Sequence, residues 1–404
     1  MMRYCCSLSS ALNGESIFFL IELPFGLIIQ RNFLWYDIIM QFYPPSIGID
    51  ISSASIKAVS LKKGEGDEFN LAAFGKEYLP AEVLVDGEIK DYGGFAKALE
   101  SVLENKEFAF PKTKYFVVSL PEEKAFLRIL ELPSSLKKEE FENALKFEIE
   151  ANIPVSLDEV YYDHEILKHP HPSGNYIDVM VNAIPKRIVD SYVNFFKKYG
   201  FQPLAFEIES VATKRALFPC CDSSIKETVL VLDIGASRTC FMIVSEEMLR
   251  FTSSNSVAGD TFSKTLSEHF PMNLKEAEFM KRVVGLDNNH EKGKELLEVL
   301  RPSLVMVKEQ IQNYIEFFEN HPTKDNFSDE AKKVSKIILT GGGATLWGIK
   351  DWISQELGLP VIFGNPLGKI KESRDSKTRM SLEDSLAYST AVGLAMRNFI
   401  EMEK

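Results

Sequence analysis

Apolar and polar positions follow the same order in two segments that lie far apart along the chain. Ile49–Leu61 has the pattern of an apolar strand with Asp50 near its end, a turn of small residues and a second apolar-rich strand, and Leu232–Val244 repeats this order around Asp233. Each segment predicts a β-hairpin, because β-rich runs joined by Gly or Ser favour a tight turn. The second aspartate follows the first by 183 residues (233 minus 50). A recurring hairpin predicts two related halves that face each other.

A glycine-rich loop in the last quarter of the chain separates two regular elements. Ile337–Thr340 has an apolar strand pattern, and the run Gly341-Gly342-Gly343-Ala344-Thr345 leads into a helical pattern at Leu346–Leu357. A flexible connector is one interpretation of three glycines. A strand, a glycine loop and a helix in this order also bring backbone N–H groups close to a nucleotide, and the tight spacing favours that function.

Two longer stretches have the spacing of amphipathic helices. The first, Leu136–Asn152, has its apolar stripe at Phe141, Ala144, Leu145 and Ile149. Ser134 or Ser135 is its expected N-cap. The second, Glu295–Asn320, repeats apolar residues at spacings of three and four. We expect both stripes to pack into a core.

The first forty residues differ in pattern from the rest. Ser16–Ile29 is an apolar run of 14 residues that contains Glu22 and Pro24. A membrane-spanning helix needs about 20 apolar residues, and both of these residues disfavour one. Three interpretations stay open: translated upstream sequence with Met40 as the natural start, an interfacial membrane anchor, or an additional packed element. We leave residues 1–40 out of the fold prediction.

Composition and charge narrow the class of protein. The chain has 404 residues, 45% of them hydrophobic and 26% charged, which predicts two or three globular domains and excludes a polytopic membrane protein or a wholly disordered chain. Its formal net charge of −12 disfavours non-specific nucleic-acid binding, which depends on Lys and Arg neutralising phosphates. The five cysteines include no CxxC spacing, so no zinc or dithiol site is predicted.

The chemistry of the two hairpins favours a phosphate ligand. Backbone N–H groups in turns made of Gly, Ser and Thr can converge on an anion without obstruction by large side chains. An aspartate beside such a turn can hold hydrated Mg²⁺, which prefers a few carboxylates and several waters. Two such turns, one in each half, predict a site that binds the phosphates of a nucleotide together with Mg²⁺ from both sides of a cleft.

The two hairpins, the glycine loop and an Ala-rich helical pattern at Ala387–Met396 together resemble the actin-like ATPases. Within that superfamily the chain resembles the PilM branch, cytoplasmic proteins of type IV pilus assembly related to the cell-division protein FtsA, and the most similar stretches are Phe141–Leu167, Tyr176–Ser210 and Val257–Arg282. The resemblance runs from about Ile47 to Asn398. It implies an α/β fold, namely a two-lobed, actin-like (ribonuclease H-like) architecture with duplicated β-sheet domains flanked by helices and an inserted small α/β subdomain.

The same resemblance implies a division of the chain. Residues 1–45 would lie outside the fold. The first lobe would span residues 46–222, with an inserted subdomain at about 119–186. The second lobe would span residues 223–404, with a smaller subdomain at about 258–334 and a C-terminal helix that returns to the first lobe.

The resemblance also implies roles for residues of the hairpins and the glycine loop. Asp50 and Asp233 would order Mg²⁺ and water. The residues expected to bind ATP, mainly its phosphates, are Ser52, Ser53, Ser55, Gly235, Ala236, Ser237, Thr239, Gly259, Gly341, Gly342, Gly343 and Ala344. Relatives usually carry Gly at the position of Ser52, so its hydroxyl would either crowd a phosphate or replace one hydrogen bond.

Two candidate residues lie on a helical pattern between the second hairpin and the glycine loop. Glu278 and Lys281 match a helix that contacts ribose and adenine in the relatives. By spacing alone, a Glu–Lys pair at i, i+3 is more typical of a solvated helix surface. Both interpretations stay open.

Glu209 is the candidate catalytic residue. It matches the position at which actin-like proteins place a polar group that orients the attacking water, and a carboxylate there can act as a base or hold water. Glu207 and Glu209 also alternate with Phe206 and Ile208, which is typical of an exposed strand face. Any hydrolysis would be slow, because the sequence contains no evident strong general base.

The function implied by the resemblance is an ATP-binding scaffold in the cytoplasm, held at the inner membrane through partners. Nucleotide-dependent cleft closure would regulate docking of the N-terminal cytoplasmic tail of a PilN-like membrane protein. No nucleic-acid partner is expected, and self-association is left open. Two alternatives remain: a sugar- or acetate-kinase-type phosphotransferase on the same fold, for which we find no substrate-base motif, and an FtsA-like protein, whose C-terminal amphipathic helix has no counterpart in residues 399–404.

Overall fold

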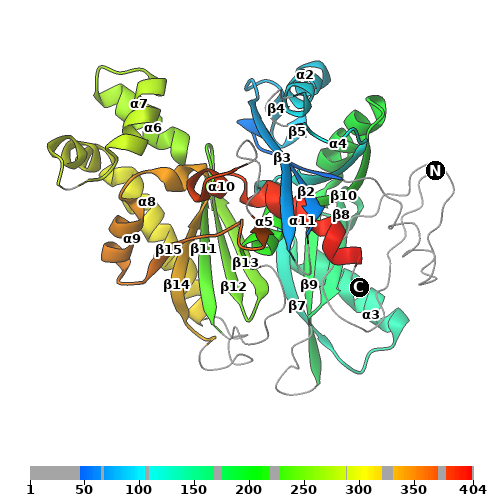
Figure 1. Ribbon diagram of the computed structural model, residues 1–404. Coiled ribbons are helices and arrows are strands. Elements are labelled where there is room, and N and C mark those ends of the chain that lie inside the picture. Colours follow the sequence, from blue (N-terminus) through cyan, green and yellow to red (C-terminus); the bar gives the residue numbers. More distant parts are fainter. Residues whose placement is uncertain are drawn as a thin grey trace. The chain divides into compact units, whose positions relative to one another are not determined.

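The computed structural model describes residues 46–64, 68–104, 109–167, 175–218, 227–287, 289–320, 331–371 and 379–402 (Figure 1). They form two compact units. Unit 1 contains the described residues up to Ala212, those of the segment Lys369–Arg379 and those from Ala391 onward, and unit 2 contains Thr213–Gly368 and Met380–Thr390. The apolar run Ser16–Ile29 and Met40 lie outside the described residues. Among the described helices, none is both long and apolar enough to cross a membrane.

Unit 1 is built on a six-stranded sheet with the strand order β10-β6-β1-β2-β3-β16. Strands β1, β2 and β3 form an antiparallel meander, while β6 runs parallel to β1 and β10 runs parallel to β6. The strands are β1 (Ile47–Ile51), β2 (Ser55–Lys63), β3 (Phe69–Tyr78), β6 (Tyr115–Leu120), β10 (Gln202–Ile208) and β16 (Ile370–Lys371). A short hairpin joins β3 to the first helix and consists of β4 (Leu84–Val85) and β5 (Glu88–Ile89).

Helices cover both faces of this sheet because successive strand residues point to opposite sides. Phe116 and Val118 belong to a core shared with two helices, whereas Val117 belongs to a second cluster with Ala212 and Leu394. The first face is covered by α2 (Tyr92–Leu103) and α4 (Lys186–Lys198), and the second by α5 (Glu209–Leu217) and α11 (Ser389–Met402).

Unit 2 repeats the arrangement with a five-stranded sheet in the order β13-β12-β11-β14-β15. Its strands are β11 (Thr228–Ile234), β12 (Thr239–Ser245), β13 (Met248–Asn255), β14 (Val334–Thr340) and β15 (Val361–Phe363). Its helical elements are α6 (Gly259–His269), α7 (Leu274–Val283), α8 (Glu291–Asn320), η4 (Gly342–Thr345), α9 (Ile349–Leu357) and α10 (Leu382–Leu386). The helix predicted at Glu295–Asn320 is confirmed as α8, which begins four residues earlier (295 minus 291).

The strand orders confirm the predicted duplication. Five strands of unit 1, in the order β3-β2-β1-β6-β10, correspond to β13-β12-β11-β14-β15 of unit 2. In both sheets the first three strands are antiparallel, and the last two continue parallel to the hairpin's first strand. The repeated hairpin found in the sequence is therefore the start of a repeated sheet.

A small α/β subdomain interrupts unit 1 between β6 and α4. Its three-stranded sheet has the order β7-β9-β8, and its elements are β7 (Phe126–Pro133), α3 (Lys138–Asn152), η2 (Leu157–Glu159), β8 (Val160–Ile166) and β9 (Tyr176–Pro185). The predicted apolar stripe of α3 is confirmed, since Phe141, Leu145 and Ile149 are buried in a core of the subdomain's own. The predicted serine cap is wrong, because the N-cap is Lys137, whose backbone N–H donates to Glu140 Oε2 at 2.9 Å.

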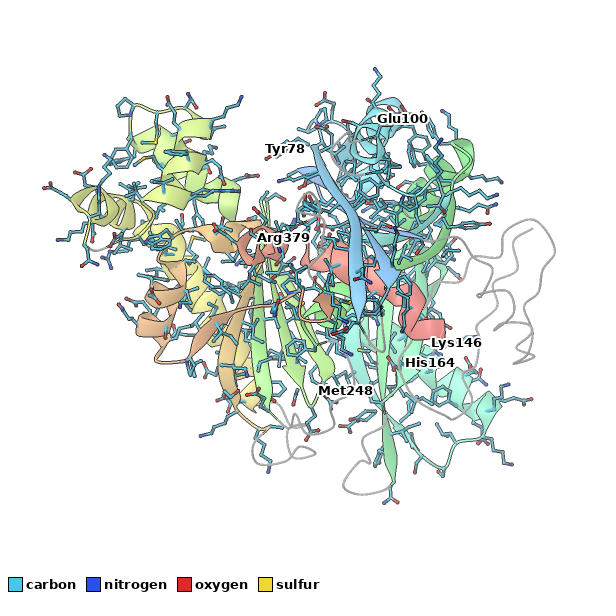
Figure 2. All side chains as sticks on the ribbon, viewed as in Figure 1. Tyr78, Glu100, Lys146, His164, Met248 and Arg379 are labelled. Atoms are coloured by element: carbon cyan, nitrogen blue, oxygen red, sulfur yellow. The ribbon has the colours of Figure 1, made fainter. Side chains whose placement is uncertain are left out.

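The small sheet also packs a half-buried histidine against α3. Figure 2 labels His164 on this subdomain, and the centroid of its ring lies 5.5 Å from that of Phe141. Burial lowers the pKa of His164, and the negative charge of Glu142 offsets this shift only in part. His164 therefore forms part of the packing of the subdomain as a mostly neutral ring at neutral pH.

Two glycines let α11 approach other backbone segments of unit 1. A Cβ added at Gly48 of β1 would lie 2.5 Å from the Ala391 carbonyl oxygen, and one added at Gly393 would overlap the Ala212 carbonyl oxygen of α5. The backbones of α5 and α11 are thus in direct contact. The Ala-rich helix was predicted to begin at Ala387, but α11 begins two residues later at Ser389.

Gly393→Ala should destabilise the protein although alanine is the better helix former. The overlap with the Ala212 carbonyl oxygen forces α5 and α11 apart, which we expect to cost about 1–3 kcal/mol. Gly93→Ala on α2 is the control, since its nearest atom would be Asp91 Oδ1 at 3.4 Å, and it should be neutral or stabilising by up to about 1 kcal/mol. Urea unfolding monitored by circular dichroism measures both, and equal midpoints for the two variants would refute the contact.

Candidate functional site

The turn of the first hairpin is closed by its own serines. Ser52 N–H donates to the Ser55 carbonyl oxygen at 3.0 Å. The Ser52 hydroxyl donates to the same oxygen at 3.1 Å and accepts from Ser55 N–H at 3.2 Å. The backbone of Ser52 is not in the left-handed region that would demand glycine. The hydroxyl at this position therefore stabilises the turn, and Ser53 lies within it.

The turn of the second hairpin is closed by the same kind of backbone hydrogen bond. Gly235 N–H donates to the Arg238 carbonyl oxygen at 2.8 Å, so the bond again links residue i to residue i+3. A Cβ at Gly235 would lie 2.8 Å from that oxygen, which explains the glycine. Ala236 and Ser237 form the middle of this turn. The offset of 183 found for the aspartates also relates Ser52 to Gly235 (235 minus 52).

The first aspartate lies in a buried polar cluster. Asp50 is 4% exposed, and its Oδ2 lies 2.8 Å from Lys57 Nζ, the residue directly across the hairpin. The Ser119 hydroxyl on β6 lies 3.4 Å from Asp50 Oδ1 and accepts from Ile51 N–H at 2.8 Å. Sequence reasoning missed Lys57, although its cross-strand register with Asp50 was a usable signal. In the second hairpin Cys240 occupies the corresponding position opposite Asp233.

Polar residues gather where the parallel strands of unit 1 end. Asp50 lies near the end of β1, Glu122 follows β6 in the 3-10 helix η1 (Glu122–Lys124), and Glu209 follows β10 as the first residue of α5. The buried carboxylate of Glu122 accepts from Ser210 N–H at 3.1 Å and so caps α5. Sequence reasoning missed Glu122, whose signal was an acidic residue directly after an apolar strand.

The alternation around Glu209 does not mark an exposed strand face. Glu207 is buried, and its Oε1 lies 2.8 Å from Arg397 Nη1 on α11. The surface interpretation is therefore wrong for Glu207. Glu209 belongs to the helix that follows, at the edge where Asp50 and Glu122 also lie.

The glycine loop of unit 2 packs directly against the second aspartate. Gly341 has φ +85°, and a Cβ there would overlap Asp233 Oδ1. A Cβ at Gly343 would lie 2.5 Å from Ile234 Cγ2, whereas one at Gly342 would have only Ala387 Cβ, at 3.6 Å, as a neighbour. The loop is not extended, because Gly342–Thr345, which includes the buried Ala344, forms the 3-10 helix η4.

Helices α6 and α7 are tied to the second hairpin turn. Gly259 N–H and Asp260 N–H donate to the Gly235 and Ala236 carbonyl oxygens, at 3.1 and 2.7 Å. Lys281 Nζ donates to the Gly259 carbonyl oxygen at 2.7 Å. One further hydroxyl predicted to bind phosphate, that of Thr239, donates to the Val257 carbonyl oxygen at 2.7 Å.

The Glu278–Lys281 pair is not a solvated surface pair. Lys281 is 4% exposed, and its Nζ lies 2.7 Å from Glu278 Oε2, which also accepts from the Ser263 hydroxyl at 2.9 Å. Burial lowers the pKa of Lys281, and the charge of Glu278 opposes that shift. For Glu278, burial raises the pKa, but Lys281, the Ser263 hydroxyl and the charge of Arg282 together outweigh this and lower it. The solvated-helix interpretation is wrong for Lys281.

The predicted residues thus form one group in each unit. In unit 1 they are Asp50, Ser52, Ser53, Ser55 and Glu209, joined by Lys57, Ser119 and Glu122. In unit 2 they are Asp233, Gly235, Ala236, Ser237, Thr239, Gly259, Glu278, Lys281, Gly341, Gly342, Gly343 and Ala344.

These groups suit a nucleotide with Mg²⁺. No cluster of three or more His, Cys, Asp or Glu that could hold a metal occurs in the part of the chain described. Mg²⁺ usually takes one or two carboxylates and completes its shell with phosphate oxygens and water, so each unit offers one aspartate of a suitable kind, Asp50 or Asp233. The backbone surface at Gly341 and Gly343, which a Cβ would fill, fits a ligand that needs close approach to the main chain.

Comparison with known proteins agrees with this fold. A family model described as type IV pilus assembly protein PilM matches residues 48–399. A solved PilM–PilN type IV pilus biogenesis complex contains a chain with 23% identity and a TM-score of 0.73, covering 87% of this chain and 98% of that one.

Two further structures share the architecture at lower similarity. The ethanolamine utilization protein EutJ of Carboxydothermus hydrogenoformans has 16% identity and a TM-score of 0.51, covering 88% of this chain and 90% of its own. MreB5 of Spiroplasma citri bound to AMPPNP has 15% identity and a TM-score of 0.51, covering 89% and 97%. These likenesses confirm the predicted actin-like fold.

Gly341→Ala should disturb the second aspartate, whereas Gly342→Ala should not. The first variant combines a left-handed backbone with overlap at Asp233 Oδ1, and we expect it to lose about 1–3 kcal/mol of unfolding free energy. The second meets only Ala387 Cβ at 3.6 Å, so it should stay within about 0.5 kcal/mol of the parent. Urea denaturation compares them, and a Gly341→Ala variant as stable as Gly342→Ala would contradict the packing described.

Proposed function

The chain belongs to the PilM family of type IV pilus assembly proteins, and we propose that it acts there as a scaffold whose state is set by binding ATP and Mg²⁺. The observation that carries this proposal is the pair of hairpin turns. Each turn is closed by the same backbone hydrogen bond, from residue i to residue i+3, and an aspartate lies two residues before it. Turns of this kind suit phosphate, and an aspartate beside each suits a hydrated divalent cation. The AMPPNP complex of MreB5, a protein of similar fold, supports this ligand class.

Each group of residues has a role in this proposal. The turns at Ser52–Ser55 and Gly235–Arg238 would hold phosphates through backbone N–H groups, and Lys57 would supply positive charge beside them. Asp50 and Asp233 would hold Mg²⁺ through water. When bound, the Mg²⁺–nucleotide supplies charge neutralisation at the phosphates.

The adenosine part of the proposed ATP would contact unit 2. Gly341–Ala344 offers close backbone approach, and Glu278 with Lys281 lies one helix away from the second turn. Glu209 would hold a water molecule for slow hydrolysis, since it lies at the sheet edge that also carries Asp50.

Nucleotide would act on the scaffold by shifting its conformational equilibrium. The two groups of residues belong to separate units, and a ligand that binds both favours whichever arrangement allows both sets of contacts. We propose that this arrangement controls docking of the N-terminal tail of a PilN-like inner-membrane protein beside the small subdomain. The protein would then act in the cytoplasm, at the membrane through that partner.

Replacing Asp233 with alanine should remove the stabilisation that ATP and Mg²⁺ give. Ligand at about a hundred times its Kd stabilises a protein by roughly 2.7 kcal/mol, which raises the melting temperature measurably. Asp233→Ala should abolish this shift, whereas Asp351→Ala on α9, whose side chain is 71% exposed, should keep it. Thermal melting with and without ATP–Mg²⁺ measures the effect, and an unchanged shift in Asp233→Ala counts against the proposal.

Docking of the partner tail should protect the small subdomain from hydrogen exchange. A synthetic peptide with the N-terminal sequence of a PilN-like protein is added to the full chain with ATP–Mg²⁺, and amide exchange is followed by mass spectrometry. We expect slower exchange in β7, β8 and β9, with a scrambled peptide as the control. Protection confined to unit 2 would exclude this docking site.

A further inference from the structure

The residue that opens the first hairpin turn bonds to the turn through its side chain, which its counterpart in the second turn cannot do. The Ser52 hydroxyl oxygen accepts from Ser55 N–H at 3.2 Å. The corresponding residue of the second turn is Gly235, which has no side chain. Because both turns are closed by the same backbone hydrogen bond, this hydroxyl is a chemical difference within a repeated structure.

The Ser52 hydroxyl is fully engaged with Ser55. Its hydrogen is donated to the Ser55 carbonyl oxygen at 3.1 Å, while its oxygen accepts from the N–H of the same residue. The Ser55 hydroxyl lies 3.5 Å from Ser52 Oγ as well. A serine hydroxyl has only one hydrogen to donate. In this arrangement Ser52 therefore offers no side-chain donor to an anion that approaches the turn.

This arrangement opposes the binding of a phosphate at the first turn. A phosphate binds to such a turn by accepting from its backbone N–H groups, and the N–H of Ser55 already has an acceptor in Ser52 Oγ. Ser55 is 3% exposed, so its N–H depends on an acceptor that the protein or a ligand supplies. A phosphate oxygen must therefore displace the Ser52 hydroxyl before it can use this donor.

The hydroxyl is not needed to close the turn. Ser52 N–H donates to the Ser55 carbonyl oxygen at 3.0 Å, and this backbone bond does not involve the side chain. In the second turn the corresponding bond, from Gly235 N–H to the Arg238 carbonyl oxygen, is made at 2.8 Å without any hydroxyl at that position. Removing the Ser52 hydroxyl should therefore leave the first turn formed and the Ser55 N–H free to bind a phosphate.

We propose that Ser52 is an autoinhibitory residue, whose hydroxyl occupies the Ser55 N–H in the ligand-free protein and thereby weakens the binding of ATP–Mg²⁺ through its phosphates. This inference rests on the function proposed above. Affinity then depends on a competition between one side-chain oxygen and one phosphate oxygen for the same donor. Gly235 brings no such competitor to the turn of unit 2.

Ser52→Ala should lower the stability of the protein and strengthen its binding of nucleotide. The ligand-free variant loses the side-chain hydrogen bonds to Ser55, so it should melt at a lower temperature. Its Kd for ATP–Mg²⁺ should fall about two- to tenfold, because no hydroxyl has to be displaced. Ser52→Gly gives the first turn the residue of the second and should also lower the Kd. A serine that only held the turn in its binding shape would give the opposite change.

Ser191→Ala is the matched control in the same unit. The Ser191 hydroxyl on α4 donates to the Ile188 carbonyl oxygen at 2.7 Å and accepts from Ile89 N–H at 3.3 Å, so it has the same two kinds of partner. Like Ser52 it is half-buried, but it does not belong to either hairpin turn. Ser191→Ala should therefore lower the melting temperature and leave the Kd for ATP–Mg²⁺ unchanged.

Thermal melting without ligand and isothermal titration with ATP–Mg²⁺, both on the full chain, test the inference. The expected result is tighter binding by both Ser52 variants and unchanged binding by Ser191→Ala. An unchanged or raised Kd in Ser52→Ala overturns the inference, and so does an equal fall in Kd in Ser191→Ala; neither result affects the proposed function if the parent protein binds ATP–Mg²⁺. Binding by the Ser52 variants alone supports autoinhibition, whereas no binding by the parent or by either Ser52 variant refutes the proposed function itself.

Discussion

In both sheets three neighbouring strands run parallel, so their carboxyl ends meet along one edge. The strands are β1, β6 and β10 in unit 1 and β11, β14 and β15 in unit 2. The chain must leave the sheet at that edge through turns and helix starts, whose backbone groups have no sheet partners. This constraint places Asp50, Glu122 and Glu209 together in one unit, and Asp233 beside Gly341 in the other. The sheet topology alone is enough to bring these polar residues together at this edge, whatever their function.

The two halves satisfy the same backbone geometry with different side chains. In the first turn the Ser52 hydroxyl makes two additional hydrogen bonds to Ser55. In the second turn Gly235 has no Cβ that would clash with the Arg238 carbonyl oxygen. Across the hairpins, Asp50 faces Lys57, whereas Asp233 faces Cys240. Duplication therefore preserved the fold while the chemistry diverged, and only the first hairpin has a cation opposite its aspartate.

The sequence alone was sufficient to predict those features of the fold that depend on the local pattern of apolar and polar residues. Period-two alternation with small turn residues identified both hairpins, and the helical stripe of α3 was recognisable because its core positions are three and four residues apart. Features that depend on distant partners could not be found this way. Glu207 looks like a surface residue until Arg397, 190 positions later (397 minus 207), is brought against it. Lys281 looks solvated until α6 presents the Gly259 carbonyl oxygen to it.

Acidic side chains gather at the edge of unit 1 where its parallel strands end. Burial raises the pKa of Tyr192, and the charges of Glu209, Glu123 and Asp50 raise it further, while the buried Glu122 carboxylate accepts from Ser210 N–H. Like charges this near repel, and repulsion is stronger when they are partly buried, because the effective dielectric constant is lower. Lys57 offsets Asp50, and the amino-terminal end of α5, with its positive partial charge and the N–H of Ser210, offsets Glu122. Local partners within unit 1 therefore offset part of this repulsion.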